Sequence, residues 1–197
     1  MHAAQNKLVL ASNNPGKLKE FGALFATIGM EVLSQAEFAV PEADEPHLTF
    51  VENALEKARH AARLTGLPAL ADDSGVCVNA LGGRPGVQSA RYAGEPKSDA
   101  RNCDKLIADL ADQADRSAYY YCVLVYVRHA DDPQPVIADG RWDGVIVSDP
   151  RGAGGFGYDP YFMVDGLQRT AAELSAAEKN ALSHRGQALR ALIEKLR

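Results

Sequence analysis

Apolar residues in the first quarter of the chain follow two periods, one typical of strands and one typical of helices. A short apolar run at residues 7–11 predicts a strand. Apolar side chains then recur every three or four positions over residues 18–28, which predicts one buried helix face, and Gly29 ends that helix. Residues 31–34 predict a second short strand, and the polar, proline-interrupted residues 35–47 predict an acidic loop.

The next segment predicts a helix and a strand that lead to two adjacent carboxylates. Thr49 and Glu52 match a capping box, which predicts the start of a helix, and Gly66 marks its end. The apolar residues 68–71 predict a strand. We expect this strand to end at the sequence Asp-Asp-Ser-Gly of residues 72–75.

The second half of the chain continues the alternation of helices and strands. A helix is predicted over residues 98–114. Residues 119–127 are apolar at both parities of a strand, which predicts a central strand covered on both faces. Residues 135–147 alternate around Asp139-Gly140 and predict a hairpin or a meander. A final helix carries an apolar stripe over residues 189–196.

Helices that alternate with strands predict an α/β fold, in which helices cover the faces of a sheet. The segment 119–147 favours antiparallel pairing, so the predicted sheet is mixed. No linker divides the chain, and we expect residues 1–197 to form a single domain.

Composition narrows the possible partners. The 197 residues include 21 Lys and Arg against 26 Asp and Glu, a formal net charge of −5. This balance argues against non-specific binding of nucleic acid, which needs a basic face, but does not exclude a small anionic substrate. The longest apolar stretch, residues 118–127, is half of the roughly 20 residues that a membrane-spanning helix needs.

The cellular setting is inferred from the N-terminus and the cysteines. Residues 1–7 are polar and predict no secretory signal. The three cysteines, Cys77, Cys103 and Cys122, contain no C-x-x-C pair. An odd number of thiols in this arrangement favours a reducing, cytoplasmic location.

A candidate phosphate site lies between the first strand and the first helix. A turn before a helix offers backbone N–H groups and a helix N-terminus to an anion, and a lysine there adds a full positive charge. It is not a Walker A loop, because the first glycine and the Ser/Thr after the lysine are missing. The alternative is a plain turn with an Asn cap. The candidate residues are Ser12, Asn13, Asn14, Pro15, Gly16 and Lys17.

Asp72 and Asp73 form a candidate catalytic or metal site. Ligands gather at the carboxyl ends of strands in open α/β sheets, and carboxylates are the ligands that Mg²⁺ prefers. If the strand continued, the two side chains would point to opposite faces. The acidic residues 42–45 could supply a further metal ligand. The alternative is a solvated turn in which Gly75 provides unusual backbone geometry.

The segment 152–159 formally matches G-x-G-x-x-G, but a strand rather than a helix is predicted after it, so we reject a dinucleotide fold. A mobile glycine loop could present Phe156 for stacking on a planar base, or Phe156 could be buried in the core. Arg185 extends the apolar stripe of the last helix and therefore needs a partner, either a ligand or a protein carboxylate. His184 beside it adds a donor, and Lys57 leans toward the interior on its helix.

Taken together, the motifs resemble the inosine triphosphate pyrophosphatase family, also called dITP/XTP pyrophosphatases. The matching segments run through the chain in the order of that family, which makes their joint specificity high. They are residues 10–17 (LASNNPGK), 48–54 (LTFVENA), 57–59 (KAR), 71–75 (ADDSG), 81–86 (LGGRPG), 89–94 (SARYAG), 154–160 (GGFGYDP), 172–174 (AEL), 178–180 (EKN) and 183–186 (SHRG). The chain departs from the family at Ser12, where Thr is common, and at Asn13, where Gly is common.

The resemblance implies hydrolysis of purine nucleoside triphosphates with deaminated bases (ITP, dITP and XTP) to the monophosphate and pyrophosphate. It also implies Mg²⁺, a homodimer, and an elongated mixed sheet in two lobes around a central cleft. Residues 12–17 and Lys57 would hold the triphosphate, and Ser74 would touch substrate. Asp73 would be the general base and a metal ligand, with Glu45 as the second ligand and Asp44 as its substitute. The implied base-recognising residues are Phe156, Gly157, Tyr158, Asp159, Lys179, His184 and Arg185.

Three other functions remain open at this stage. A nucleotide-binding regulator would need no carboxylate pair at a strand. A Maf-like pyrophosphatase for pyrimidine or modified nucleotides would differ in its base pocket. An interaction module without a small ligand would leave Lys57 and Arg185 unexplained.

Overall fold

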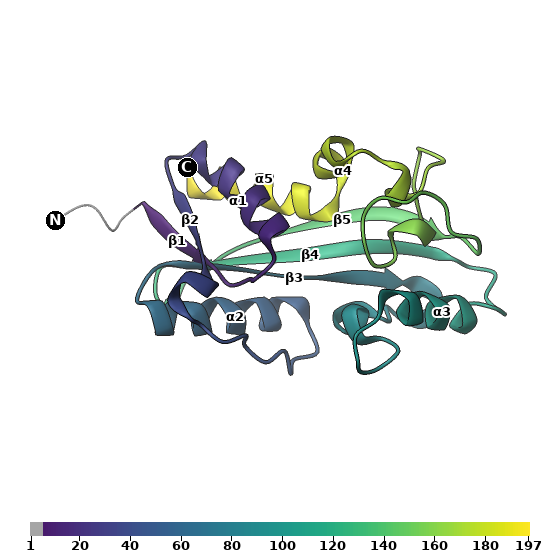
Figure 1. Cartoon of the computed structure of the whole chain (residues 1–197), viewed down its shortest axis with the longest axis horizontal. Helices are drawn as coiled ribbons and strands as arrows, with labels where there is room; N and C mark the ends of the chain where they lie inside the picture. The colour runs from purple at the N-terminus through teal and green to yellow at the C-terminus, as the bar shows by residue number, and fades with distance from the viewer. Residues whose placement is uncertain (1–5) are drawn as a thin grey trace. The chain divides into compact units, whose positions relative to one another are not determined.

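A computed structural model describes residues 6–197 and has the predicted α/β architecture, one mixed sheet flanked by helices (Figure 1). The sheet has six strands in the order β2-β1-β3-β4-β5-β6. Its strands are β1 (Lys7–Leu10), β2 (Glu31–Ser34), β3 (Ala69–Val78), β4 (Ser117–Val127), β5 (Val136–Ile146) and β6 (Phe162–Val164). The α-helices are α1 (Pro15–Ala26), α2 (Phe50–Thr65), α3 (Asp99–Asp109), α4 (Ala176–Leu182) and α5 (His184–Leu196). The short 3-10 helices are η1 (Gln35–Phe38), η2 (Asn79–Leu81), η3 (Gly86–Arg91), η4 (Asp159–Tyr161) and η5 (Ala171–Glu173).

Strand directions make the sheet mixed, as predicted. β1 pairs in parallel with β2 and with β3, whereas β5 and β6 are antiparallel. β4 lies inside the sheet, and its last six residues are all buried, which matches the prediction of a covered central strand. None of the helices within residues 6–197 has the length and apolar content needed to cross a membrane. Most of the N-terminal stretch interpreted as lacking a secretory signal lies outside the described residues.

The predicted hairpin around Asp139-Gly140 is wrong. These residues lie in the middle of β5, whose side chains alternate between exposed and buried from Ile137 to Ile146. Asp139 is on the exposed face and Gly140 on the buried face, so the dipeptide fits the alternation without a turn. The alternation of polar and apolar residues predicted the strand correctly. The turn propensity of Asp-Gly was overridden because the dipeptide lies inside that strand.

The predicted end of the third strand at Asp72 is also wrong. β3 continues through residues 72–75 to Val78, and every residue of β3 except Ser74 is buried. The last register pair between β1 and β3 is Leu10 with Leu70, so the two aspartates lie just past the carboxyl end of β1 instead. Gly75 has no positive φ. It is required because an added Cβ would lie 2.2 Å from the carbonyl oxygen of Gly86.

The helix boundaries follow local signals. Asn14 caps α1, whose first residue is Pro15, and Thr49 caps α2 through the backbone N–H of Glu52. Gly66 adopts the left-handed conformation that ends α2. The helix predicted over 98–114 is shorter, since α3 ends at Asp109. The predicted loop at 35–47 begins with one turn of 3-10 helix.

The chain forms two compact units, each with its own internal packing. Among the described residues, unit 1 comprises 6–73, 123–139 and 188–197. Its helix α2 lies on one face of β1 and α1 lies on the other (Figure 1). Unit 2 comprises residues 74–122 and 140–187, with α3 and α4 on opposite faces of its strands (Figure 1). The core of unit 2 includes Val76, Leu106, Tyr120, Trp142, Ile146 and Phe162.

Candidate functional site

The turn between β1 and α1 in unit 1 satisfies part of its own hydrogen bonding. The Oδ1 of Asn14 accepts the backbone N–H groups of Gly16 at 2.8 Å and Lys17 at 3.2 Å, and Pro15 has no N–H to donate. The Oγ of Ser12 accepts the N–H of Asn14 at 3.2 Å. Because the side chain of Asn14 already engages two donors of the first helical turn, attraction of an anion to this turn depends chiefly on the charge of Lys17.

Asn13 fastens the turn to neighbouring segments. Its Oδ1 accepts a hydrogen bond from the buried side chain of Gln35 at 3.1 Å, and its Nδ2 donates to Glu42 at 3.3 Å. Both groups of the Asn13 amide therefore hold the turn against η1 and the acidic loop. Sequence analysis did not identify Gln35, because a single polar residue in a loop carries no sequence signal of burial.

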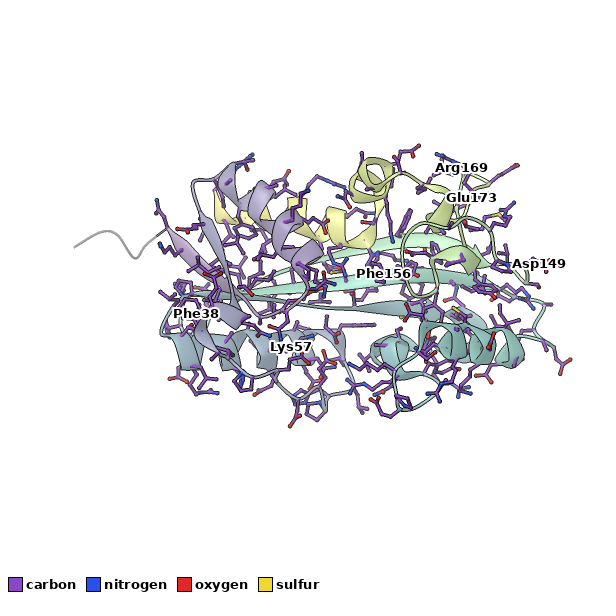
Figure 2. All side chains as sticks on the ribbon, in the orientation of Figure 1. Phe38, Lys57, Asp149, Phe156, Arg169 and Glu173 are labelled. Carbon is purple, nitrogen blue, oxygen red and sulfur yellow. The ribbon has the colours of Figure 1, made fainter. Side chains whose placement is uncertain are left out.

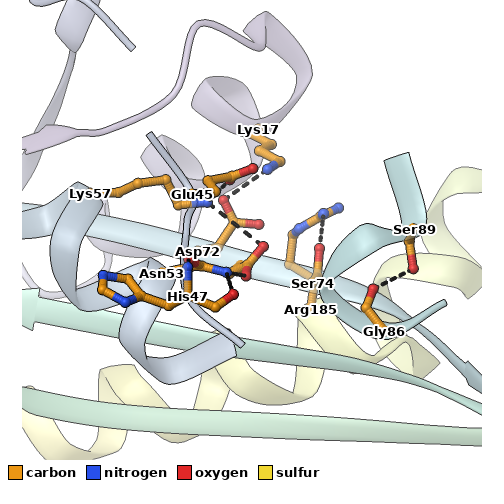
Figure 3. Close-up of polar contacts among 11 residues, drawn as sticks. Lys17, Glu45, His47, Asn53, Lys57, Asp72, Ser74, Gly86, Ser89 and Arg185 are labelled. Carbon is orange, nitrogen blue, oxygen red and sulfur yellow. Dashed lines mark hydrogen bonds and ion pairs between the residues drawn. The ribbon is translucent and has the colours of Figure 1, made fainter. Parts of the chain in front are cut away.

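Lys17 is paired with the buried carboxylate of Asp72. The Nζ of Lys17 lies 2.8 Å from the Oδ1 of Asp72, whose side chain is 2% exposed (Figure 3). Asp72 and Asp73 alternate along β3, so Asp72 contacts α1 while Asp73 contacts α2. These contacts with different helices confirm the prediction that, in a strand that continues, the two side chains point to opposite faces.

Lys57 of α2 contacts two carboxylates. Its Nζ lies 2.6 Å from the Oε1 of Glu45 (Figure 3) and 3.7 Å from the Oδ1 of Asp73. The buried amide of Asn53 donates to the Oδ2 of Asp73 at 3.2 Å and also bonds the backbone of His47. Asn53 and Lys57 are one helical turn apart, which explains why both reach the same carboxylate. Asp44 is exposed, so of the two acidic candidates the structure brings only Glu45 to Lys57.

Burial and charge shift the protonation equilibria of this cluster. Burial raises the pKa of Asp73 to about 6, against the lowering effect of Lys57, with Glu45 adding to the rise and Asn53 opposing it. For Lys57, burial alone would lower the pKa, but Asp73, Asp72 and Glu45 outweigh it and raise the pKa above its ordinary value. The pKa of Asp73 is thus in the range that suits a general base near neutral pH.

The unit 1 cluster has one net negative charge when all its groups are ionised, since two lysines face three carboxylates (Lys17, Lys57; Glu45, Asp72, Asp73). Residues 6–197 contain no group of three or more His, Cys, Asp or Glu side chains arranged to hold a metal. Glu45 and Asp73, however, converge on one cationic group, the ammonium of Lys57. One or two carboxylates completed by substrate phosphates and water are what Mg²⁺ commonly takes, so this donor set fits that ion.

In unit 2, a buried carboxylate organises a second group of predicted residues. Asp159 is 2% exposed, and its Oδ2 accepts the backbone N–H of Phe156 at 2.8 Å and the ammonium of Lys179. Its Oδ1 accepts the hydroxyl of Tyr120 at 3.2 Å. Asp159 therefore positions Phe156 and Lys179 from the interior, and its three partners leave it a supporting role. Sequence analysis missed Tyr120, because it lies within an apolar strand.

The glycine-rich loop is fastened, whereas the sequence suggested a mobile loop. The N–H of Gly154 donates to Ala172 at 3.0 Å, and that of Gly157 donates to Asp99 at 2.8 Å. Gly155 has a φ of +73°, and an added Cβ would lie 2.0 Å from the Oδ2 of Asp159. Phe156 is 63% exposed (Figure 2), and the centroid of its ring lies 4.8 Å from the Nζ of Lys179. The alternative of a buried Phe156 is therefore wrong.

The other predicted residues of unit 2 differ in exposure. Tyr158 is 4% exposed and donates to the carbonyl of Ser89 at 2.8 Å, so it packs in the core. His184 is 7% exposed and stacks on Tyr120, with ring centroids 4.8 Å apart and planes 9° apart. The guanidinium of Arg185 donates to the hydroxyl of Ser74 at 3.3 Å (Figure 3). This contact joins two residues that are 111 positions apart in the sequence.

Known proteins of one family match this chain over nearly its whole length. A model of the Ham1 family matches residues 8–195. The chain is 66% identical to a dITP/XTP pyrophosphatase of Ralstonia nicotianae, over 97% of this chain and 96% of the relative. It is 67% identical to a dITP/XTP pyrophosphatase of Chromobacterium violaceum, over 98% of each. Among solved structures, a HAM1 protein from Coxiella burnetii is similar with a TM-score of 0.93 and 52% identity, over 96% of this chain and 98% of that one.

Proposed function

The chain belongs to the Ham1 family, and on that premise we propose that it hydrolyses non-canonical purine nucleoside triphosphates, namely ITP, dITP and XTP, to the nucleoside monophosphate and pyrophosphate. It is a hydrolase of phosphoanhydride bonds and removes deaminated purines from the nucleotide pool. The relatives named dITP/XTP pyrophosphatase support this function, because the chain matches them over almost their full length. The family match over residues 8–195 supports treating residues 1–197 as one functional domain.

The observation that carries the proposal is the cluster of Lys17, Lys57, Glu45, Asp72 and Asp73 in unit 1. Each lysine is paired with a carboxylate: Lys17 with Asp72, and Lys57 with Glu45 and with Asp73, the residue next to Asp72 on β3. Phosphoryl transfer depends mostly on positioning and on neutralising charge, and two lysines held in this way suit a triphosphate. We assign triphosphate binding to Lys57 and to the turn residues, which are Ser12, Asn13, Asn14, Pro15, Gly16 and Lys17.

Asp73 and Glu45 would hold Mg²⁺ together with the phosphates, and Asp44 is the less suited candidate because it is exposed. When bound, the ion supplies charge neutralisation at the phosphate oxygens. The cluster has one net negative charge without it, so a triphosphate would be repelled; a divalent cation reverses that sign.

Asp73 acts as the general base. Its raised pKa of about 6 leaves it ionised at neutral pH yet basic enough to take a proton from water. Asn53 donates to Oδ2 of Asp73 and fixes the orientation of the carboxylate, so that Oδ1 remains on the side of Lys57. The water, losing its proton to Asp73, would attack one of the two phosphorus atoms joined by the α,β-bridging oxygen. The bridging P–O bond would break and release the monophosphate and pyrophosphate, with Lys17 and Lys57 stabilising the charge that develops on the phosphates.

Residues of unit 2 recognise the base. Phe156 is exposed and offers its ring for stacking, and Lys179 and Arg185 offer donors to the acceptor O6 of hypoxanthine or xanthine. Ser74 contacts substrate beside Arg185. The 6-amino group of adenine would face these donors and leave them unpaired, at about 1–3 kcal/mol each. Tyr158, Asp159 and His184 hold this group in place from the interior, and Gly157 is held at the surface by its hydrogen bond to Asp99.

The cellular and quaternary setting is part of the same proposal. We expect a cytoplasmic homodimer that binds neither nucleic acid nor membrane. Three buried cysteines that form no disulfide support a reducing location, and the net charge of −5 disfavours a polyanion as partner. Leu48 of unit 1 is 89% exposed, and Phe38 of the same unit is 40% exposed (Figure 2 labels Phe38).

The test is a panel of nucleotides with Mg²⁺, namely ITP, dITP, XTP, ATP, GTP, CTP and UTP. We expect hydrolysis of ITP, dITP and XTP with kcat/KM at least tenfold above that for ATP, since one unpaired donor is worth that factor. Comparable kcat/KM for ATP and ITP would refute the base assignment, and no hydrolysis of any nucleotide would refute the function.

A further inference from the structure

The ammonium of Lys57 occupies the space between the two carboxylates assigned to the metal. Its Nζ lies 2.6 Å from Glu45 and 3.7 Å from Asp73, and its side chain is only 14% exposed (Figure 3). An ammonium and a divalent cation seek the same carboxylate oxygens. They repel each other at this range, so Lys57 and the metal cannot both be held there.

We propose that Lys57 holds the place of the divalent cation in the nucleotide-free protein and leaves it when the metal–triphosphate complex binds. The inference rests on the proposed function, and it assigns to Lys57 a second role, control of when the metal enters. Glu45 and Asp73 gain the metal, and the ammonium of Lys57 gains phosphate oxygens in exchange for carboxylate oxygens. Each charge thus keeps a partner of opposite sign throughout binding.

The electrostatics of unit 1 favour this exchange. With Lys57 in place the cluster carries one net negative charge, so its attraction for a free divalent cation is weak. Removing the ammonium would leave two net negative charges and two uncovered metal ligands. The flexible four-carbon stem of lysine allows its head group to move while α2 stays fixed by buried Ala54, Ala58 and Ala61.

Lys17 provides a contrast within the same cluster. Its ammonium pairs with Asp72, which points to the other face of β3, and not with the two proposed metal ligands. Removing Lys17 lowers the local charge by the same amount but opens no ligand position. Substituting Lys57 therefore tests direct competition with the metal for its ligands, whereas substituting Lys17 tests the effect of local charge alone.

The exchange predicts that the metal binds weakly until a triphosphate is present whose phosphate oxygens can bind the ammonium of Lys57. Metal without nucleotide must displace the ammonium into water, whereas metal with nucleotide offers it new oxygen partners. This coupling would keep the catalytic carboxylates from holding a stray cation. It would also tie the metal to the substrate on which it acts.

The test is a titration of the full chain with Mn²⁺ in the absence of nucleotide, with free Mn²⁺ followed by electron paramagnetic resonance. We compare wild type with Lys57→Gln and with the matched control Lys17→Gln, each of which keeps an amide donor for its carboxylate. Lys57→Gln should bind Mn²⁺ about tenfold more tightly than wild type, and Lys17→Gln should change affinity less than threefold. The added Glu45→Gln change should abolish the gain.

An equal affinity in Lys57→Gln and wild type, or an equal gain in Lys17→Gln, would overturn the proposal. If loss of Lys57 destabilises unit 1, the effect of Mn²⁺ on the thermal unfolding midpoint (Tm) is measured in place of the binding titration. Mn²⁺ should then raise the Tm of Lys57→Met by several degrees more than that of wild type, and an equal rise would also overturn it. Because no nucleotide is present, these results do not depend on the ITP assay, and failure of that assay would be recognised separately.

Discussion

Asp72 and Asp73 are consecutive residues of β3, yet they contact different helices: Asp72 pairs with Lys17 of α1, whereas Asp73 lies against Asn53 and Lys57 of α2. Alternation along the strand produces this division, because neighbouring side chains point to opposite faces. It separates a buried structural pair from the carboxylate that we assign to catalysis, and the predictions below follow from that separation.

Asp73→Asn should abolish turnover and keep the fold. The amide has nearly the same shape and can still contact Asn53, but it cannot accept a proton, so kcat should fall by about 10²–10⁴-fold or more. The measurement is kcat for ITP beside the Tm and the affinity for a non-hydrolysable ITP analogue. Wild-type turnover in this variant would contradict the role of Asp73 as base.

The pH dependence of kcat/KM should reflect Asp73. Burial raises its pKa to about 6, and the base must be ionised, so activity should rise with pH through about 6 and level off above it. Raising the Mg²⁺ concentration should move the inflection to lower pH, because metal binding competes with protonation of its ligand. A rate that falls between pH 5 and pH 7 would be incompatible with this assignment.

Phe156→Ala should weaken binding of every purine alike. Loss of stacking on an exposed aromatic costs about 1–3 kcal/mol, so KM should rise about 5- to 150-fold while kcat changes little. Phe156→Trp should restore most of the affinity, because any aromatic face can stack. The ratio of kcat/KM for ITP to that for ATP should stay unchanged, and a collapse of that ratio would assign base discrimination to Phe156.

Gly75→Ala should destabilise unit 2. Its Cβ would lie 2.2 Å from the carbonyl oxygen of Gly86 and 2.5 Å from the Oγ of Ser89, so the backbone of β3 or η3 must shift. Overpacking of this kind costs about 1–3 kcal/mol. The control is Gly22→Ala in α1, where the Cβ meets nothing within 4 Å, and it should be neutral or stabilising by up to about 1 kcal/mol. Equal Tm values for the two variants would refute the close approach.

Asp132 should make unit 1 sensitive to acid. The guanidinium of Arg128 and backbone N–H groups hold the pKa of this 1% exposed carboxylate well below its usual range. The stabilisation is therefore present above the unfolded pKa of about 4 and is lost as the pH falls toward the folded pKa. Thermal unfolding from pH 7 to pH 2 should show a steeper loss of Tm in wild type than in Asp132→Asn. Parallel slopes would contradict this account.

Most of the fold could be predicted from the sequence because the strongest signals in the sequence are local. The cap at Thr49, the end at Gly66 and the apolar run of β4 each predicted an element that the structure contains. The errors arose where turn propensity competed with a strand. Asp139-Gly140 and Asp72-Asp73 are both turn-like dipeptides, and each lies inside a strand whose pairing within the sheet overrides local preference.

For the candidate site, the sequence supplied residue types but not their partners. It proposed Lys57, Glu45 and Asp73 separately, and only the fold shows that one ammonium contacts both carboxylates. Gln35 and Tyr120 were missed, since each acts by a hydrogen bond to a residue far along the chain, Asn13 and Asp159 respectively. Such pairings depend on tertiary structure and leave no periodic trace in a single sequence.

The most direct test of the central claim is the stoichiometry of the products from ITP. With purified protein and Mg²⁺, pyrophosphate and orthophosphate are measured against IMP in the same reaction. The account predicts one pyrophosphate for each IMP, no release of orthophosphate, and loss of both products in Asp73→Asn. Orthophosphate with IDP would place the cut at the wrong bond and contradict the claim.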